Sequence, residues 1–64
     1  MKTQKEFAAR LGVHFSLVSH VLKGRRNFSV DKAEIAGALT GSSPLIWMKT
    51  GQERQRQQAF SAAV

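Results

Sequence analysis

The 64-residue sequence contains no cysteine, one proline and one tryptophan. Without cysteine the chain forms no disulfide and offers no thiolate ligand to a metal ion. Its two histidines, His14 and His20, do not have the three- or four-residue spacing of ligands on one helix face, so we expect no metal site. No apolar run approaches the roughly 20 residues of a membrane-spanning helix, and no apolar signal core follows the first residues. We therefore expect a cytoplasmic protein without membrane contact.

Acidic residues are also few. Four Asp and Glu stand against ten Lys and Arg, which gives a formal net charge of +6. This excess favours polyanionic partners, nucleic acid first and an anionic membrane surface second. A basic surface that only keeps the protein soluble explains the net charge equally well. The length predicts a single small domain over residues 1–64, whose core depends on close helix packing or on a partner subunit.

The first predicted helix covers residues 3–11. Thr3 is a suitable N-cap, and Glu6 follows at the spacing of a capping box. At 100° per residue, Phe7 and Leu11 fall on one side of this helix. Gly12 is expected to end it, because glycine adopts the left-handed conformation without steric cost.

The second predicted helix, over residues 14–23, is cleanly amphipathic, and Gly24 is expected to end it. No polar residue interrupts its apolar side. The apolar side consists of Leu17, Val18, Val21 and Leu22, and the outward side of Phe15, Ser16, Ser19, His20 and Lys23.

A third helix is predicted from Ser29, a good N-cap, to about Thr40. Gly37 is expected to weaken this helix slightly. Its core residues are expected to be Ile35, Ala36 and Leu39.

Further helices are predicted toward the C-terminus. Pro44 occupies the first position of a short helix in which Trp47 is expected to fill the core, so that the supporting helices span residues 29–49. The tail has good helix-forming residues and predicts a C-terminal helix over about residues 52–63. No strand-like alternation occurs, so the chain is expected to be all-α with four to five short helices.

Residues 3–24 meet the physical requirements of a helix-turn-helix unit. The two helices must cross closely, and Ala8 provides a small residue at the contact. The turn needs a residue that tolerates positive φ, which is Gly12. Val13 and Val18 are placed to seal the crossing. In such a unit the second helix lies in the major groove of DNA.

The stretch "TQKEFAARLGVHFSLVSHVLKGRR" resembles the helix-turn-helix of Cro/C1-type (phage repressor-like, XRE family) regulators. "LVSHVL" also resembles the headpiece of LacI-type repressors, whereas "IAGALTGSSPLIWM" is similar to the Cro/C1 continuation. The resemblance covers about residues 3–48 and implies a lambda repressor-like all-α fold of phage or bacterial origin. The matching residues are Thr3-Gln4, Phe7-Ala8, Leu11-Gly12-Val13, Val18-Ser19 and Gly24.

The sequence departs from this family's pattern in two places. Family members usually have a helix before the helix-turn-helix, and here the C-terminal helix or a second subunit is expected to cover that side of the first helix. The residue before the second helix is usually serine, whereas this chain has His14. The N-cap is therefore expected to be weaker, or His14 has another role.

The resemblance assigns DNA contacts to the outward side of the second helix and to its flanks. Phe15 is suited to a thymine methyl or, equally, to the rim of the core, and serine and histidine side chains suit base edges. Each basic residue is also consistent with a solvent-exposed charge that contacts no DNA. Base contacts are expected from Phe15, Ser16, Ser19 and His20, and phosphate contacts from Gln4, His14, Lys23, Arg25 and Arg26.

The expected function is sequence-specific regulation of transcription, in the form of a repressor. A homodimer on a palindromic duplex is expected, with self-contact through Phe60 and Val64 or through the region of Trp47. The alternative is an antitoxin or phage accessory protein that binds a protein as well as DNA. RNA is less favoured, because aromatic residues that stack on unpaired bases are scarce. No catalytic arrangement is present, so we expect no enzymatic activity, no cofactor and no small-molecule ligand.

Overall fold

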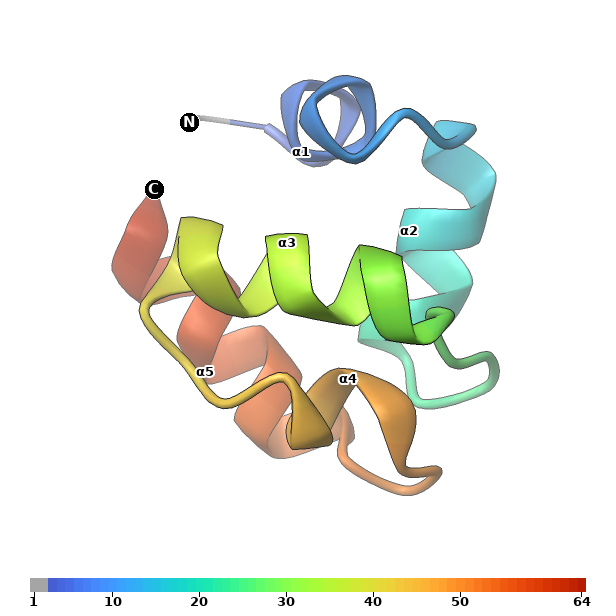
Figure 1. Ribbon diagram of the computed structural model, residues 1–64, viewed down its shortest axis with the longest axis vertical. Helices are drawn as coiled ribbons and strands as arrows, with labels where there is room; N and C mark the ends of the chain where they lie inside the picture. The colour runs from blue at the N-terminus through green and yellow to red at the C-terminus, as the bar shows by residue number, and fades with distance from the viewer. Residues whose placement is uncertain (1–2) are drawn as a thin grey trace.

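The computed structural model describes residues 3–64, which form five helices and no strand. In Figure 1, α1 lies across the top, α2 descends along one side, and α3 crosses in front of α5. This arrangement confirms the predicted all-α class. Within the described part of the chain, no helix has the length and apolar character needed to cross a membrane. The helices are α1 (Gln4–Leu11), α2 (Phe15–Leu22), α3 (Val30–Thr40), α4 (Leu45–Met48) and α5 (Glu53–Ala63).

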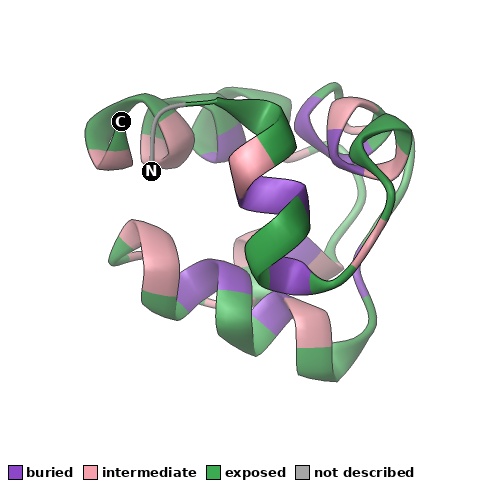
Figure 2. Ribbon diagram, turned by 90° about the horizontal axis from the view of Figure 1, so that it is seen from above, coloured by how far each residue is buried: buried purple, intermediate pink, exposed green. Residues whose placement is uncertain are grey.

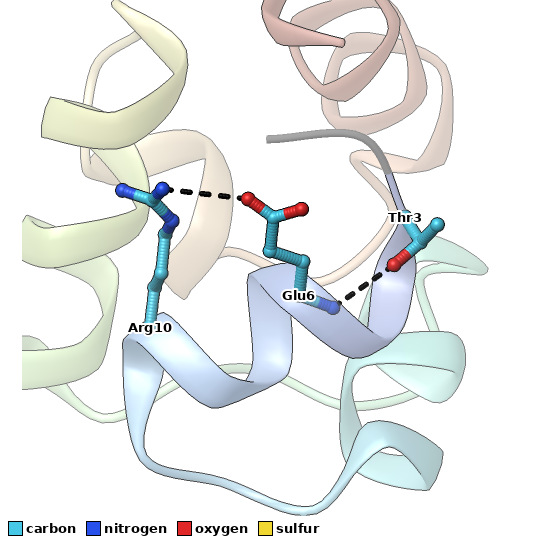
Figure 3. A network of polar contacts seen from close by, with 3 residues as sticks. All are labelled: Thr3, Glu6 and Arg10. Carbon is cyan, nitrogen blue, oxygen red and sulfur yellow. Dashed lines mark hydrogen bonds and ion pairs between the residues drawn. The ribbon is translucent and has the colours of Figure 1, made fainter.

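Helix α1 is fixed at both ends by local interactions. The Thr3 hydroxyl accepts a hydrogen bond from the backbone N–H of Glu6 at 3.1 Å, and the Arg10 guanidinium donates to the Glu6 carboxylate at 3.3 Å (Figure 3). Gly12 follows in the left-handed conformation with φ of 72°. This residue turns the chain sharply enough for α2 to pack directly across α1.

Helix α2 begins after His14 and ends before Lys23, which form its N-cap and C-cap. The backbone N–H of Gly24 donates to the carbonyl of Val21 at 3.0 Å, and Gly24 has φ of 77°. The glycine therefore leads the chain out of the helix into the turn that precedes α3.

The core is built around four aromatic side chains from four parts of the chain. Trp47 is fully buried, and its ring lies 5.6 Å from that of Phe7 and 5.7 Å from that of Phe28, measured between centroids. Its indole N–H donates to the Ser42 hydroxyl at 3.0 Å. The prediction that Trp47 fills the core is confirmed. Figure 2 shows the buried segments of the helices facing the space that they enclose.

The C-terminal helix contacts α1, the helix of which the family resemblance left one side open. The ring of Phe60, on α5, lies 5.3 Å from the ring of Phe7 between centroids. Phe7 has no exposed surface. Of the two elements expected there, α5 thus contacts α1 through Phe60, and a contact with a second subunit stays a prediction.

The buried face of α3 differs from the predicted one. The sequence predicts Ile35 in the core, but 38% of its surface is exposed. The buried residues of the helix are Ala33, Ala36 and Gly37, and Leu39 is partly buried against the core. The prediction for Ile35 is wrong because Trp47 and the phenylalanines already supply the core's bulk, so α3 turns its small residues inward.

Gly37 permits a close approach between α3 and the segment that leads to α4. A Cβ atom at this position would lie 2.7 Å from the Ser42 carbonyl oxygen and 3.1 Å from the Pro44 nitrogen. The backbone N–H of Ser42 donates to the Gly37 carbonyl at 2.9 Å. The expectation that Gly37 only weakens α3 is therefore incomplete, because its missing side chain makes room for backbone.

Candidate nucleic-acid interface

Helix α2 divides its side chains between the core and the surface as its amphipathic pattern predicts. Val18 and Val21 have no exposed surface. Ser16 and His20 are exposed on the opposite side, while Ser19 is half-buried. The outward row thus presents two hydroxyl groups and one imidazole to any partner that approaches this helix.

His14 forms the N-cap of α2 through its imidazole ring. Its Nδ1 accepts a hydrogen bond from the backbone N–H of Ser16 at 3.2 Å. Because a backbone amide only donates, Nδ1 must be unprotonated and the proton of the neutral ring must lie on Nε2. The Ser16 hydroxyl, 2.9 Å from Nδ1, then donates to the same atom. The exposed His14 thus has a free Nε2–H donor, and Ser16 keeps oxygen lone pairs that can accept.

Phe15 lies at the surface between two basic side chains. Its ring stacks on that of His14 with centroids 4.9 Å apart and 28° between the planes, and the Lys5 Nζ lies 5.4 Å from its centroid. Of its surface, 45% is exposed. The ring is therefore held at the start of α2 by stacking and by a cation–π contact.

A groove of about 240 Å³ runs beside α2 and brings together three of the predicted contact residues. Gln4 and Ser19 contribute to it from α1 and α2, and Lys23 contributes a cation. The opposite wall comes from α5. The lining residues are Gln4, Ser19, Leu22, Lys23, Gln57, Phe60 and Ser61.

Two further predicted residues lie apart from the groove, in the turn after α2. Arg25 and Arg26 are both exposed. The backbone N–H of Arg25 donates to the carbonyl of His20 at 3.0 Å, which ties this turn to the last part of α2. We call residues 24–28 the basic turn. His14, Phe15 and Ser16 thus lie at one end of α2 and the basic turn at the other.

Residues 1–47, about three quarters of the chain, match the family model described as helix-turn-helix. The chain belongs to the Cro/C1-type helix-turn-helix family. Members of this family are DNA-binding transcription regulators, and the matched residues include all of α1, α2 and α3. No curated protein and no solved structure matches the chain.

Helix α5 lies outside the part matched to the helix-turn-helix family, and it carries a residue that the sequence analysis missed. Arg56 has no exposed surface. Its three guanidinium nitrogens donate five hydrogen bonds, and every acceptor is uncharged. The acceptors are the carbonyls of Val21, Arg26, Ile46 and Lys49 and the side-chain oxygen of Asn27.

Burial lowers the pKa of the Arg56 guanidinium from its ordinary value. Since an arginine pKa starts so high, the group remains cationic near neutral pH. One sequence feature indicates its location: Ala59, Phe60 and Ala63 follow it by three, four and seven positions, which places Arg56 on the apolar side of α5. Among the Gln, Arg and Glu residues around Arg56, this spacing is a weak signal.

Metal-ligating side chains are scattered over the described residues 3–64. No group of three or more His, Asp or Glu side chains gathers in this part of the chain. The exposed side of α2 and the basic turn offer hydrogen bonding, aromatic contact and positive charge.

Proposed function

We propose that the protein is a sequence-specific regulator of transcription that inserts α2 into the major groove of double-stranded DNA and represses by blocking access of the polymerase. The observation that carries the proposal is the division of α2 into a buried apolar side and an exposed polar side. Membership of the helix-turn-helix family supports it, because the second helix of this unit is the one that enters the groove. In this role the protein needs neither a cofactor nor an enzymatic activity.

Base recognition is assigned to the exposed side of α2. Ser16 and Ser19 carry hydroxyl groups that exchange hydrogen bonds with base edges, and His20 suits an acceptor such as guanine N7. Phe15, held by stacking and the Lys5 charge, is placed to contact a thymine methyl group. Because the Ser16 hydroxyl donates to His14, its oxygen is left to accept a hydrogen bond. This favours a base with a hydrogen-bond donor, such as the amino group of adenine or cytosine.

Phosphate contacts are assigned to both flanks of α2. Gln4 stands at the start of α1, and the Nε2–H of His14 stands at the start of α2, where helix N-termini favour anions. Lys23, Arg25 and Arg26 supply the cations at the opposite end. Such contacts fix the register of a protein on the duplex and carry most of its affinity.

A homodimer on a palindromic operator completes the proposal. One α2 of eight residues is about 12 Å long and reaches only a few base pairs. Two copies, one helical turn of DNA apart, double the number of bases contacted. Val64, which is 60% exposed, and the half-buried Phe60 are available for self-contact. In the region of Trp47, the tryptophan itself is fully buried, but Leu45 is 56% exposed and is also available.

Selection of a binding site from a random duplex pool, followed by fluorescence anisotropy on the selected duplex, tests the proposal. We expect one short sequence to be enriched and bound at moderate salt at least about a thousandfold more tightly than random DNA. A protein that prefers no duplex under these conditions contradicts the proposal and favours a protein-binding function instead.

A further inference from the structure

We propose that Arg56 is a positioning residue for DNA binding, which acts from α5 by fixing the basic turn against the end of α2. The inference rests on the proposed DNA-binding function and gives it a contribution from α5, outside the part of the chain that matches the helix-turn-helix family.

One guanidinium nitrogen joins the two elements that are proposed to meet DNA. Arg56 Nη1 donates to the carbonyl of Val21 in α2 at 2.7 Å and to the carbonyl of Arg26 in the basic turn at 2.8 Å. Nη2 donates to the side-chain oxygen of Asn27, also at 2.8 Å. Because the guanidinium is planar and its donors have fixed directions, the separation between these acceptors is fixed as well.

The same side chain anchors this pair of elements to the rest of the protein. Its Nη2 also donates to the carbonyl of Lys49 at 2.6 Å, and its Nε donates to the carbonyl of Ile46. These bonds lie at α4 and just after it. The basic turn is thus connected through one buried group to α2, α4 and α5 together.

Other contacts between α5 and the end of α2 support the same connection. The Gln57 amide donates to the carbonyl of Leu22 at 3.3 Å. A Cβ atom at Gly24 would lie 3.4 Å from the Cβ of Glu53, so the first turn of α5 also lies against the turn. A cation at the C-terminal end of α2 interacts favourably with the helix dipole. Helix α5 therefore supports the end of α2 at several adjacent points.

The consequence for DNA binding concerns the exposed Arg25 and Arg26. Long basic side chains lose conformational freedom when they bind phosphate, and a mobile backbone beneath them would add to that loss. If the basic turn is already fixed before binding, its backbone loses no further conformational freedom when the complex forms. Since phosphate contacts carry no sequence information, loss of Arg56 is expected to weaken binding to all duplexes alike.

Arg56→Lys in the full chain tests the inference. A lysine keeps the charge, but its ammonium group is compact and has only three donors. It therefore cannot reach all five acceptor atoms that the guanidinium contacts. Binding is measured with the duplex selected by the wild type, at a temperature below unfolding of the variant. We expect roughly tenfold weaker binding. The slope of log K against log salt should be shallower by about one to two. The ranking of duplex sequences should stay unchanged.

Leu39→Ala is the matched control for lost stability. Leu39 packs against the core near the far end of α3 and has no place in the proposed interface. The folded control should bind with wild-type affinity and slope. The inference is overturned if Leu39→Ala weakens binding as much as Arg56→Lys does. It is also overturned if Arg56→Lys binds like the wild type. In both cases the proposed DNA-binding function stands. A wild type that binds no duplex overturns the proposed function itself.

Asn27→Ala provides the test if Arg56→Lys does not fold. It removes one bond between the guanidinium and the basic turn and leaves four in place. Amide hydrogen exchange is measured in the free protein, so that a direct contact of Asn27 with DNA has no influence. Faster exchange of the Arg25 amide, together with weaker binding and a shallower salt slope, supports the inference. Unchanged exchange overturns it.

Discussion

Single residues at the two ends of α2 have different chemistry, and the difference predicts different kinds of defect. At the start, the His14 cap uses Nδ1, which leaves the Nε2–H and the lone pairs of the Ser16 oxygen available to a partner. At the other end, Arg25 and Arg26 offer charge in an exposed turn. A hydrogen bond to a base edge distinguishes sequences, whereas a charge beside a phosphate does not.

Replacing Ser16 or His20 by alanine is therefore expected to reduce the preference for the selected duplex by about 1–3 kcal/mol, because each replacement removes a hydrogen bond to a base edge. Arg26→Ala is the comparison, and should weaken binding to selected and random duplexes by the same factor. Anisotropy titrations against both duplexes measure the two effects. A uniform loss for the Ser16 and His20 variants would remove them from base recognition.

Arg56 is also expected to contribute to folding stability through its five buried hydrogen bonds. Replacement by methionine removes the guanidinium donor from four backbone carbonyls and the Asn27 amide, of which the Val21 carbonyl keeps its bond from the Gly24 N–H. We expect Arg56→Met to lower the free energy of unfolding by about 3 kcal/mol or more, since each buried polar group left unpaired costs about 1–3 kcal/mol. The neighbouring Arg54→Met, at an exposed position, should change it by less than about 0.5 kcal/mol. Urea unfolding followed by circular dichroism gives both values, and similar losses in the two variants would contradict the assignment.

At the scale of elements, α3 shows how packing overrides helix propensity. By propensity alone, a glycine inside a helix costs about 1 kcal/mol relative to alanine, so Gly37→Ala would be stabilising. The Ser42 carbonyl and the Pro44 nitrogen, however, occupy the space that a methyl group would need. Both are backbone atoms, which cannot move aside as a flexible side chain does.

Gly37→Ala is accordingly expected to destabilise the protein by about 1–2 kcal/mol, because overpacking outweighs the propensity gain. Ala38→Gly, at the next and exposed position, isolates the propensity contribution and should cost about 1 kcal/mol. Thermal unfolding of both variants measures the effects. A higher melting temperature for Gly37→Ala would show that the segment before α4 can move away.

At the scale of the whole molecule, the net charge of +6 acts together with the placement of a few cations. Lys23, Arg25 and Arg26 lie at one end of α2, and Lys5 lies near its other end over Phe15. Positive charge on both flanks of one helix suits a duplex, in which phosphates border both sides of the groove.

Salt is expected to weaken binding steeply. If Lys23, Arg25 and Arg26 each neutralise one phosphate, log K should fall with log salt with a slope of about −2.7 per subunit. Titrations between low and moderate salt measure the slope. A slope near zero would mean that the basic turn does not contact the backbone of DNA.

Dimer formation is the second expectation at this scale. Sedimentation equilibrium of the protein on the selected duplex should give two chains per palindrome, with each α2 in one half-site. A mass that corresponds to one chain per duplex, together with a monomer at high protein concentration, would contradict the homodimer.

The local pattern in residues 3–24 was sufficient to predict the helix-turn-helix and the outward side of α2. The cap at Thr3, the glycine turn and the 3.6-residue periodicity are local features, so they follow from residues close in the sequence. The exposure of Ser16 and His20 and the burial of Val18 and Val21 agree with that prediction. Their contacts with DNA stay a prediction.

Only the tertiary structure decided which residues of α3 and α5 are buried. Ile35 is exposed because Trp47 and the phenylalanines fill the core, and Gly37 is required because the backbone of residues 42–44 folds back against it. Arg56 became a central residue because five acceptors from separate parts of the chain converge on it. Periodicity describes one helix at a time, whereas these properties depend on how neighbouring helices share one small interior.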